Sequence, residues 1–282
     1  MRTRGARRRM RLAALTAVAI CAFAGNSLLT RAALGDGLIG AGAFAGIRLI
    51  SGAVVLLAFG LMRRQSLAPT NSALLGATFL FAYAAAFSFA YLELDAASGA
   101  LILFGSVQIA MAGAALLRGA RYSAREYLGV AIAFAGLVFL LAPRVGAPAF
   151  AAAALMAGAG AAWAGYTVNG KYSGETPVQS ITLSFLYATP AAALLLLTMN
   201  SHATTPGVLL AVASGAGASA LGYLIWYLIL PSLSIATAGA AQLLAPVVTA
   251  LGAALLLGER VSTTLALAGA LIIAGIALTL RK

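Results

Sequence analysis

Long apolar stretches alternate with short polar links along the whole chain. A helix needs about 20 apolar residues to cross the hydrocarbon core of a bilayer. The pattern therefore predicts ten transmembrane helices, at residues 12–34, 40–62, 72–92, 97–117, 127–142, 149–170, 180–199, 206–230, 235–257 and 261–280. The links between them are too short to hold a soluble domain, so we expect an all-α membrane protein.

Three separate segments recur later in the chain at a nearly constant shift. Residues 23–31 (FAGNSLLTR) align with residues 163–171 (WAGYTVNGK) at an offset of 140. The alignments of 97–100 with 237–240, at an offset of 140, and of 119–123 with 258–262, at an offset of 139, agree with it. The shift indicates a duplication, with a first repeat at residues 1–145 and a second at 146–282.

Each repeat holds five predicted helices, an odd number, so the second copy enters the membrane from the opposite side. Inverted repeats are typical of secondary transporters, whose substrate site lies near the midplane where the repeats meet. Two similar units of opposite orientation can exchange shapes and open a central cavity to either side in turn. The pattern therefore favours a carrier that works by alternating access.

Charge is scarce and is distributed as in a membrane protein. Charged residues make up 9% of the chain, against about 25% in soluble domains. The net charge of +12 lies at the start of the chain and in the links, which argues against a nucleic-acid partner. With the N-terminus inside, fourteen Lys and Arg residues fall on the cytoplasmic side and three outside. The positive-inside rule then predicts a bacterial-type inner membrane protein with both termini cytoplasmic.

The first apolar stretch allows a second interpretation. The basic start, the apolar run from Leu12 and the sequence Ala22-Phe23-Ala24 resemble a signal peptide with its cleavage site. Cleavage there would remove the first helix of one repeat and cut through its best-matched segment. The repeat therefore argues against cleavage.

Three motifs lie in the second repeat and one lies in the first. Residues 242–248 (QLLAPVV), 255–262 (LLLGERVS) and 269–275 (GALIIAG) follow one another near the end, and residues 44–49 (FAGIRL) place an arginine in the second stretch. Together they resemble the EamA family of the drug/metabolite transporter (DMT) superfamily, over nearly the whole chain. The resemblance implies ten helices in two inverted five-helix repeats and transport of a small solute without an ATPase domain.

The chain departs from the family pattern in the first repeat. Ala120 stands where the family usually has glutamate, and Val107 and Gln108 stand around an expected proline. Residues 23–26, 105–108 and the stretch around Gln242 are similar to a branch that includes bacterial amino-acid exporters. That likeness implies export of amino acids or related metabolites. Exporters of drugs or of other metabolites, nucleoside-like or cationic, remain the alternative.

Polar side chains inside apolar stretches are candidates for substrate contact, because a polar group in lipid must line a cavity or pair internally. Arg48 is the only charge well inside a predicted helix. Its guanidinium fork suits a carboxylate, although it could instead snorkel toward the interface. Asn26, Gln108 and Gln242 could hold the polar head of a substrate or join helices.

Aromatic side chains supply the apolar part of the predicted site. Faces of three predicted helices gather rings that suit an apolar or aromatic group or a cation. The candidates are Tyr83, Phe87, Trp163, Tyr166 and Tyr223. The alternative is contact with lipid or an interfacial belt, which we expect for Tyr91 and Tyr227 near the helix ends.

Two prolines, Pro190 and Pro246, lie inside predicted helices. Proline frees a backbone carbonyl and bends a helix. We predict that both prolines form kinks, either for gating or as fixed bends.

No group of residues points to an enzyme. The six acids all lie at or near the ends of predicted helices, which argues against proton-coupled export of cationic drugs. The single cysteine, Cys21, and the single histidine, His202, offer no metal or catalytic cluster. We expect a monomeric carrier of a small molecule, embedded in the lipid bilayer, with no cofactor and no metal. A channel, a non-transporting scaffold or a membrane enzyme is the weaker alternative.

Overall fold

The computed structural model describes residues 2–121, 123–141, 148–199 and 202–280. These residues form helices and turns, and the only β-type pairing among them is one isolated bridge between Ile39 and Ala203. The helices of the first half are α1 (Arg2–Gly35), α2 (Ala41–Met62), α3 (Asn71–Ala90), α4 (Ala96–Leu117) and α5 (Ala124–Leu141). Those of the second half are α6 (Phe150–Tyr172), α7 (Pro177–Thr198), α8 (Thr205–Val212), η1 (Ala213–Leu221), α9 (Gly222–Ile229), η2 (Leu230–Ser232), α10 (Ile235–Gln242), α11 (Leu244–Leu256) and α12 (Thr263–Leu280).

The described helices are long and apolar enough for a polytopic membrane protein. Eight stretches qualify as spans, namely Met10–Gly35, Ala41–Met62, Asn71–Ala90, Ala96–Leu117, Phe150–Tyr172, Pro177–Thr198, Thr205–Ser232 and Thr237–Leu256. A shorter apolar helix, Thr263–Gly275, follows them. The count of ten transmembrane helices stays a prediction.

Side-chain caps set the start of several helices. An oxygen in the side chain before the first helical residue accepts a hydrogen bond from a backbone N–H of the first turn, where no helical partner exists. Asp95 caps α4 in this way, with its Oδ1 2.7 Å from the Ser98 nitrogen. Threonine or serine caps α3, α7, α8 and α10, through Thr70, Thr176, Thr204 and Ser234.

The predicted helix at 206–230 changes its winding in the middle. Residues Ala213–Leu221 form a π-helix, η1, between α8 and α9. In a π-helix the hydrogen bonds join residues five apart, so Ser214 and Ser219 lie on one face, and both are buried. Gly215 lies against α2: a Cβ there would be 2.1 Å from the Arg48 carbonyl oxygen. A glycine is therefore required where η1 meets α2.

The predicted helix at 235–257 is broken at Leu243, between α10 and α11. Pro246 lies just after the break, and its ring and missing N–H prevent a normal helical bond to the carbonyl of Gln242 four residues earlier. The proline thus coincides with a true interruption of the helix.

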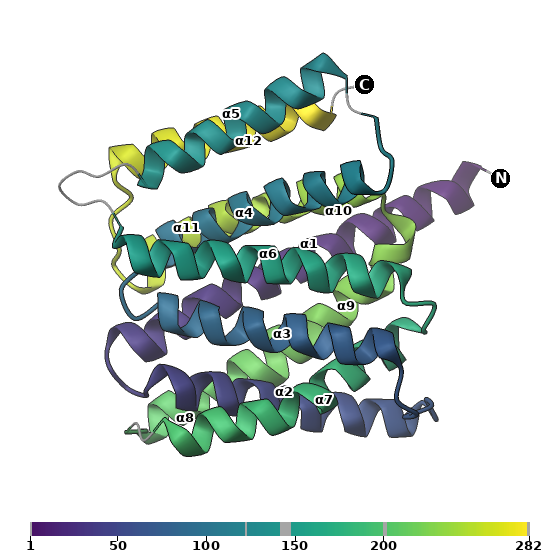
Figure 1. The fold of residues 1–282 in the computed structure, drawn as a ribbon, viewed down its shortest axis with the longest axis vertical. Coiled ribbons are helices and arrows are strands. Elements are labelled where there is room, and N and C mark those ends of the chain that lie inside the picture. The colour runs from purple at the N-terminus through teal and green to yellow at the C-terminus, as the bar shows by residue number, and fades with distance from the viewer. Residues whose placement is uncertain (1, 122, 142–147, 200–201, 281–282) are drawn as a thin grey trace.

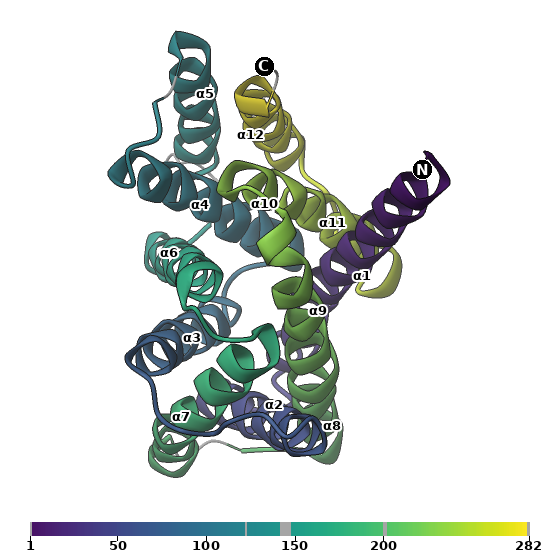
Figure 2. The same ribbon diagram turned by 90° about the vertical axis from the view of Figure 1, so that its right-hand side faces the viewer.

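Helices from the two halves of the chain interleave in the bundle (Figure 1). At one edge α5 packs along α12, and toward the other α2 packs on α7, as both views show (Figure 2). Between them α4 packs on α6, α10 and α11, while α1 packs on α8, η1, α9 and α11. Helix α3 packs on α6 and α7. Each of these contacts joins a residue range before 146 to one after it, so the centre is built by both halves.

Two tyrosines that we expected at the lipid interface are buried, so that expectation is wrong. The ring of Tyr91 lies against Gly99, where a Cβ would come within 2.4 Å of it. Tyr227 packs in the same way against Gly170, and its hydroxyl donates to the carbonyl oxygen of Tyr166 at 3.0 Å. The glycines admit the rings into the bundle because they carry no side chain.

Candidate functional site

Arg48 lies inside the bundle, with 1% of its surface exposed. Its Nε donates to Ser219 Oγ at 2.9 Å. Its Nη2 donates to the hydroxyls of Tyr223 at 2.7 Å and Tyr83 at 3.0 Å. The side chain therefore does not snorkel outward, and that alternative is wrong. The guanidinium is held at the meeting point of α2, α3 and the η1–α9 segment.

The charge of Arg48 has no counter-ion among the described residues. Its Nη1 has no hydrogen-bond partner there, and the only ion pair in those ranges joins Arg31 to Glu259. The rings of Phe87 and Tyr83 lie 5.0 and 5.1 Å from Arg48 Cζ, which offsets part of the cost through cation–π attraction. Arginine stays protonated, and a buried unpaired charge is costly. The described residues therefore leave this guanidinium without an anionic partner.

Asn26 joins the same group from α1. Its Nδ2 donates to the hydroxyls of Tyr223 at 2.8 Å and Tyr83 at 3.2 Å, and its Oδ1 accepts from Ser214 Oγ. The two tyrosine hydroxyls lie 3.0 Å apart. We call this connected group of buried residues the arginine cluster: Asn26, Arg48, Tyr83, Ser214, Ser219 and Tyr223.

A second group of buried residues packs against the arginine cluster. Trp163 Nε1 donates to Gln242 Oε1 at 2.6 Å, and Gln242 Nε2 donates to the Ala238 carbonyl oxygen at 3.2 Å. The Trp163 ring lies 4.5 Å from that of Tyr223 and 5.0 Å from that of Tyr83. Around it pack Phe23 and Tyr166, and Trp226 packs on Phe23. We call this group the tryptophan cluster: Phe23, Trp163, Tyr166, Trp226 and Gln242.

Four predicted residues belong to neither cluster, and one of them, Phe87, has its ring 5.0 Å from Arg48 Cζ. Gln108 is half-buried, and its amide packs against Gly239 of α10. Pro190 is exposed on α7. Pro246 borders an apolar pocket of about 430 Å³ between α4, α11 and α12. A role of Gln108 in binding and of the prolines in gating stays a prediction.

The sequence reasoning missed Ser214, Ser219 and Phe23 as members of the centre. The serines are five residues apart, a spacing that does not share a face in an α-helix, and only the π-helical winding of η1 aligns them. A signal for two of the aromatic contacts was present. Phe23 and Trp163, whose ring centroids lie 5.4 Å apart, are separated by the repeat offset of 140, as are Tyr83 and Tyr223.

The second half of the chain matches a known protein family. Residues 150–281 match the model of the EamA-like transporter family. This part of the chain is similar to an EamA domain. EamA proteins are membrane transporters of small solutes, which agrees with the apolar helices of this chain. The domain contributes Trp163, Tyr223 and Gln242 to the two clusters.

Similarity to other proteins extends beyond the EamA domain. The chain is 46% identical over 268 residues to the uncharacterized protein PA1977 of Pseudomonas aeruginosa, covering 94% of this chain and 93% of that one. A solved crystal structure of another protein superposes on this chain with a TM-score of 0.73 at 21% sequence identity. The superposition covers 96% of each chain. That likeness concerns the fold alone and extends to the part before the EamA domain.

Proposed function

We propose that the chain is a secondary transporter of ten transmembrane helices, built as two inverted repeats at residues 1–145 and 146–282. It functions as a monomer in a bacterial-type inner membrane, with both termini cytoplasmic, and carries a small solute by alternating access. The EamA domain at 150–281 and the sequence offset of 139–140 support the duplication. The interleaved packing of α2 on α7, α4 on α10 and α11, and α5 on α12 supports it further, since each pair occupies corresponding places in the two repeats.

The contact between Tyr83 and Tyr223 carries the proposal. Two inverted repeats are related by a pseudo-two-fold axis in the membrane plane, and a residue on such an axis meets its own counterpart. The two tyrosines are 140 positions apart, and their hydroxyls lie 3.0 Å apart. Arg48 donates to both hydroxyls. On this proposal the axis passes beside Arg48, whose Nη1 has no hydrogen-bond partner in the described part of the chain.

We propose that the solute is an amino acid or a related metabolite, which the protein exports. The carboxylate would accept from Arg48 Nη1, which has no partner in the described part of the chain, with charge-assisted bonds that a planar guanidinium forms well. The tryptophan cluster would hold the apolar part against Trp163 and Tyr166. A cationic drug fits less well, because the buried guanidinium repels it.

Transport requires that the clusters become accessible in turn to each side. In this structure Arg48, Trp163, Tyr223 and Gln242 are all buried, so the centre is closed. Alternating access would separate the helices of one repeat from those of the other on one side at a time. The central tyrosines can then exchange their mutual hydrogen bonds for bonds to the solute.

The test is transport by the purified protein in liposomes, with a panel of labelled amino acids, nucleosides and cationic dyes. We expect uptake of at least one carboxylate-bearing solute and its loss in Arg48→Gln. Arg125→Gln, which removes an exposed arginine from α5, is the matched control and should transport normally. Transport of cationic dyes alone, or equal uptake by Arg48→Gln and the native protein, would contradict the proposed substrate.

A further inference from the structure

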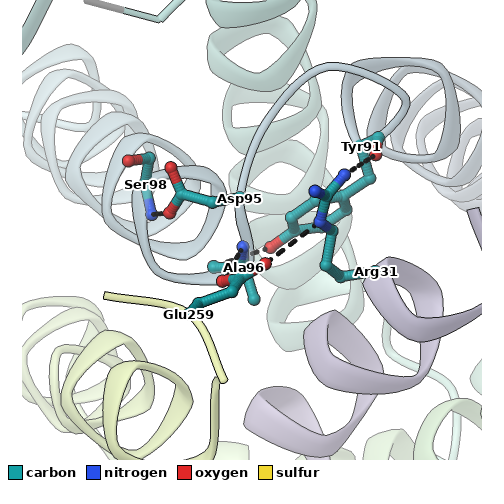
Figure 3. A network of polar contacts seen from close by, with 6 residues as sticks. All are labelled: Arg31, Tyr91, Asp95, Ala96, Ser98 and Glu259. Carbon is teal, nitrogen blue, oxygen red and sulfur yellow. Dashed lines mark hydrogen bonds and ion pairs between the residues drawn. The ribbon is translucent and has the colours of Figure 1, made fainter. Parts of the chain in front are cut away.

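An ion pair ties together three segments at one end of the bundle. Arg31, near the end of α1, donates from Nε to Glu259 Oε1 at 3.0 Å and from Nη1 to the Tyr91 carbonyl oxygen at 3.4 Å (Figure 3). The other carboxylate oxygen, Oε2, accepts from the Ala96 nitrogen at 2.8 Å. Glu259 thus connects α1 and α4 to the link between α11 and α12.

The surroundings of Glu259 strengthen this contact. Ala96 is the first residue of α4, and an anion at a helix N-terminus interacts favourably with the helix dipole. The side chains of Arg31 and Glu259 are only 26% and 17% exposed, so solvent screens the pair less than a fully exposed one. Figure 3 shows Glu259 lying between Arg31 and the start of α4, beside the Asp95 cap.

The corresponding place in the other repeat lacks this acid. Lys171 is the counterpart of Arg31 at the offset of 140, and Ala120 is the counterpart of Glu259 at the offset of 139. Lys171 Nζ donates to the carbonyl oxygens of Leu230 at 3.2 Å and Leu233 at 2.6 Å. Within the described ranges it forms no ion pair. The counterpart of Arg31 is thus present at the other end but the counterpart of Glu259 is not, and the carboxylate of Glu175 at that end accepts from Thr70 Oγ1 and not from Lys171.

We propose that the contact between Arg31 and Glu259 is a latch that holds its end of the bundle shut, and that the end at Lys171 opens more readily because Ala120 supplies no equivalent acid. The inference rests on the proposed function, since it assigns a gate to an alternating-access carrier. On the proposed topology the latched end faces outward and the end at Lys171 faces the cytoplasm.

The latch can be tested by the reactivity of a buried cysteine on each side. Ser27 lies one turn before Arg31, Thr167 lies one turn before Lys171, and the two are counterparts at the offset of 140. Both side chains are buried. In a background without the exposed Cys21, Ser27→Cys and Thr167→Cys would report the opening of each end. The probe is a charged maleimide applied in detergent micelles, where it reaches both ends.

Glu259→Gln keeps the size of the side chain and removes its charge. We expect it to raise the rate of labelling of Ser27→Cys about tenfold, the scale of one charge-assisted hydrogen bond, and not to raise that of Thr167→Cys. Arg31→Gln should act in the same direction, and the double variant should add little, because both remove one contact. Asp36→Asn is the control, because Asp36 is an exposed acid that borders a pocket of about 250 Å³ together with Arg31 and Glu259. This substitution should leave both labelling rates unchanged.

Ala120→Glu supplies the missing acid to the other end. We expect it to slow the labelling of Thr167→Cys severalfold and to slow transport, without changing the labelling of Ser27→Cys. Unchanged reactivity of Ser27→Cys in both Glu259→Gln and Arg31→Gln would overturn the latch, even if the protein transports solutes. If the reactivity changes as expected but no solute is carried in liposomes, the latch stands and the proposed function fails.

Discussion

The arginine cluster and the tryptophan cluster pack against each other through their aromatic rings. They differ in the kind of buried polar group that has no hydrogen-bond partner. In the arginine cluster, a guanidinium is surrounded by hydroxyl groups and has no anion beside it in the described chain. In the tryptophan cluster, the amide of Gln242 is bonded through both its oxygen and its nitrogen, and the buried groups without a partner are uncharged, namely the Tyr166 hydroxyl and Trp226 Nε1. On the proposed function, the arginine cluster binds the charged group of a solute and the tryptophan cluster binds its apolar part. Such a solute has a carboxylate at one end and an apolar group at the other.

The largest effect on transport is expected from removing the charge of Arg48. We expect Arg48→Gln to lower the initial rate of uptake by about 10- to 100-fold, because a hydrogen bond to a charged group contributes about 1.5–3 kcal/mol. Arg48→Lys keeps the charge but loses the planar fork, so it should fall between Arg48→Gln and the native protein. Melting curves of the purified variants check folding. A native rate in Arg48→Gln would remove the arginine cluster from the site.

A smaller effect on transport is expected from substitutions in the tryptophan cluster. Trp163→Ala and Gln242→Ala should each lower uptake by about 3- to 10-fold, since each removes a neutral hydrogen bond of about 0.5–1.5 kcal/mol and some packing, while folding stays intact. The loss should be greater for amino acids with large side chains than for small ones. Trp163→Phe, which keeps a ring, is the milder control. Normal uptake by both alanine variants in vesicles would exclude the tryptophan cluster from binding.

The smallest effect is expected from Pro190→Ala, because this proline is exposed on α7 and is a member of neither cluster. If Pro190 forms a gating kink, the maximal rate of uptake should change by about twofold, since gating acts on conformational steps. The solute concentration at half-maximal uptake should stay constant, and uptake measured over a range of concentrations separates the two quantities. A changed half-maximal concentration would instead place α7 in contact with the solute, whereas an unchanged rate and an unchanged concentration would show that the proline forms only a fixed bend.

The positions of the helices followed from the sequence more closely than their internal winding. The predicted stretches 40–62 and 97–117 correspond to α2 at Ala41–Met62 and α4 at Ala96–Leu117, because bilayer thickness fixes the length of an apolar stretch. The π-helix at Ala213–Leu221 was not predicted, whereas the break at Leu243 lies beside Pro246, where a kink was predicted. The winding of η1 depends on which carbonyl each N–H finds, and hydropathy carries no information on that choice.

The candidate site was predicted in part for a similar reason. The cost of polarity in lipid marks Arg48 and Asn26 without knowledge of the fold, and both lie in the arginine cluster. The same criterion selected Gln108, which packs against Gly239 instead. Whether a polar side chain faces the centre depends on the rotation of its helix, and this is set by packing between segments far apart in the chain. The repeat offset is the one sequence feature that carried such long-range information.

The wide winding of η1 has a mechanical consequence. Such a turn can shift along its helix one residue at a time while the helix stays continuous, and each step rotates only the residue that the turn passes. Tyr223 and Trp226 lie immediately downstream, in α9. A wide turn that moved from η1 into α9 would therefore rotate first the Tyr223 ring and then the Trp226 ring about the helix axis, without pulling any helix out of the bundle.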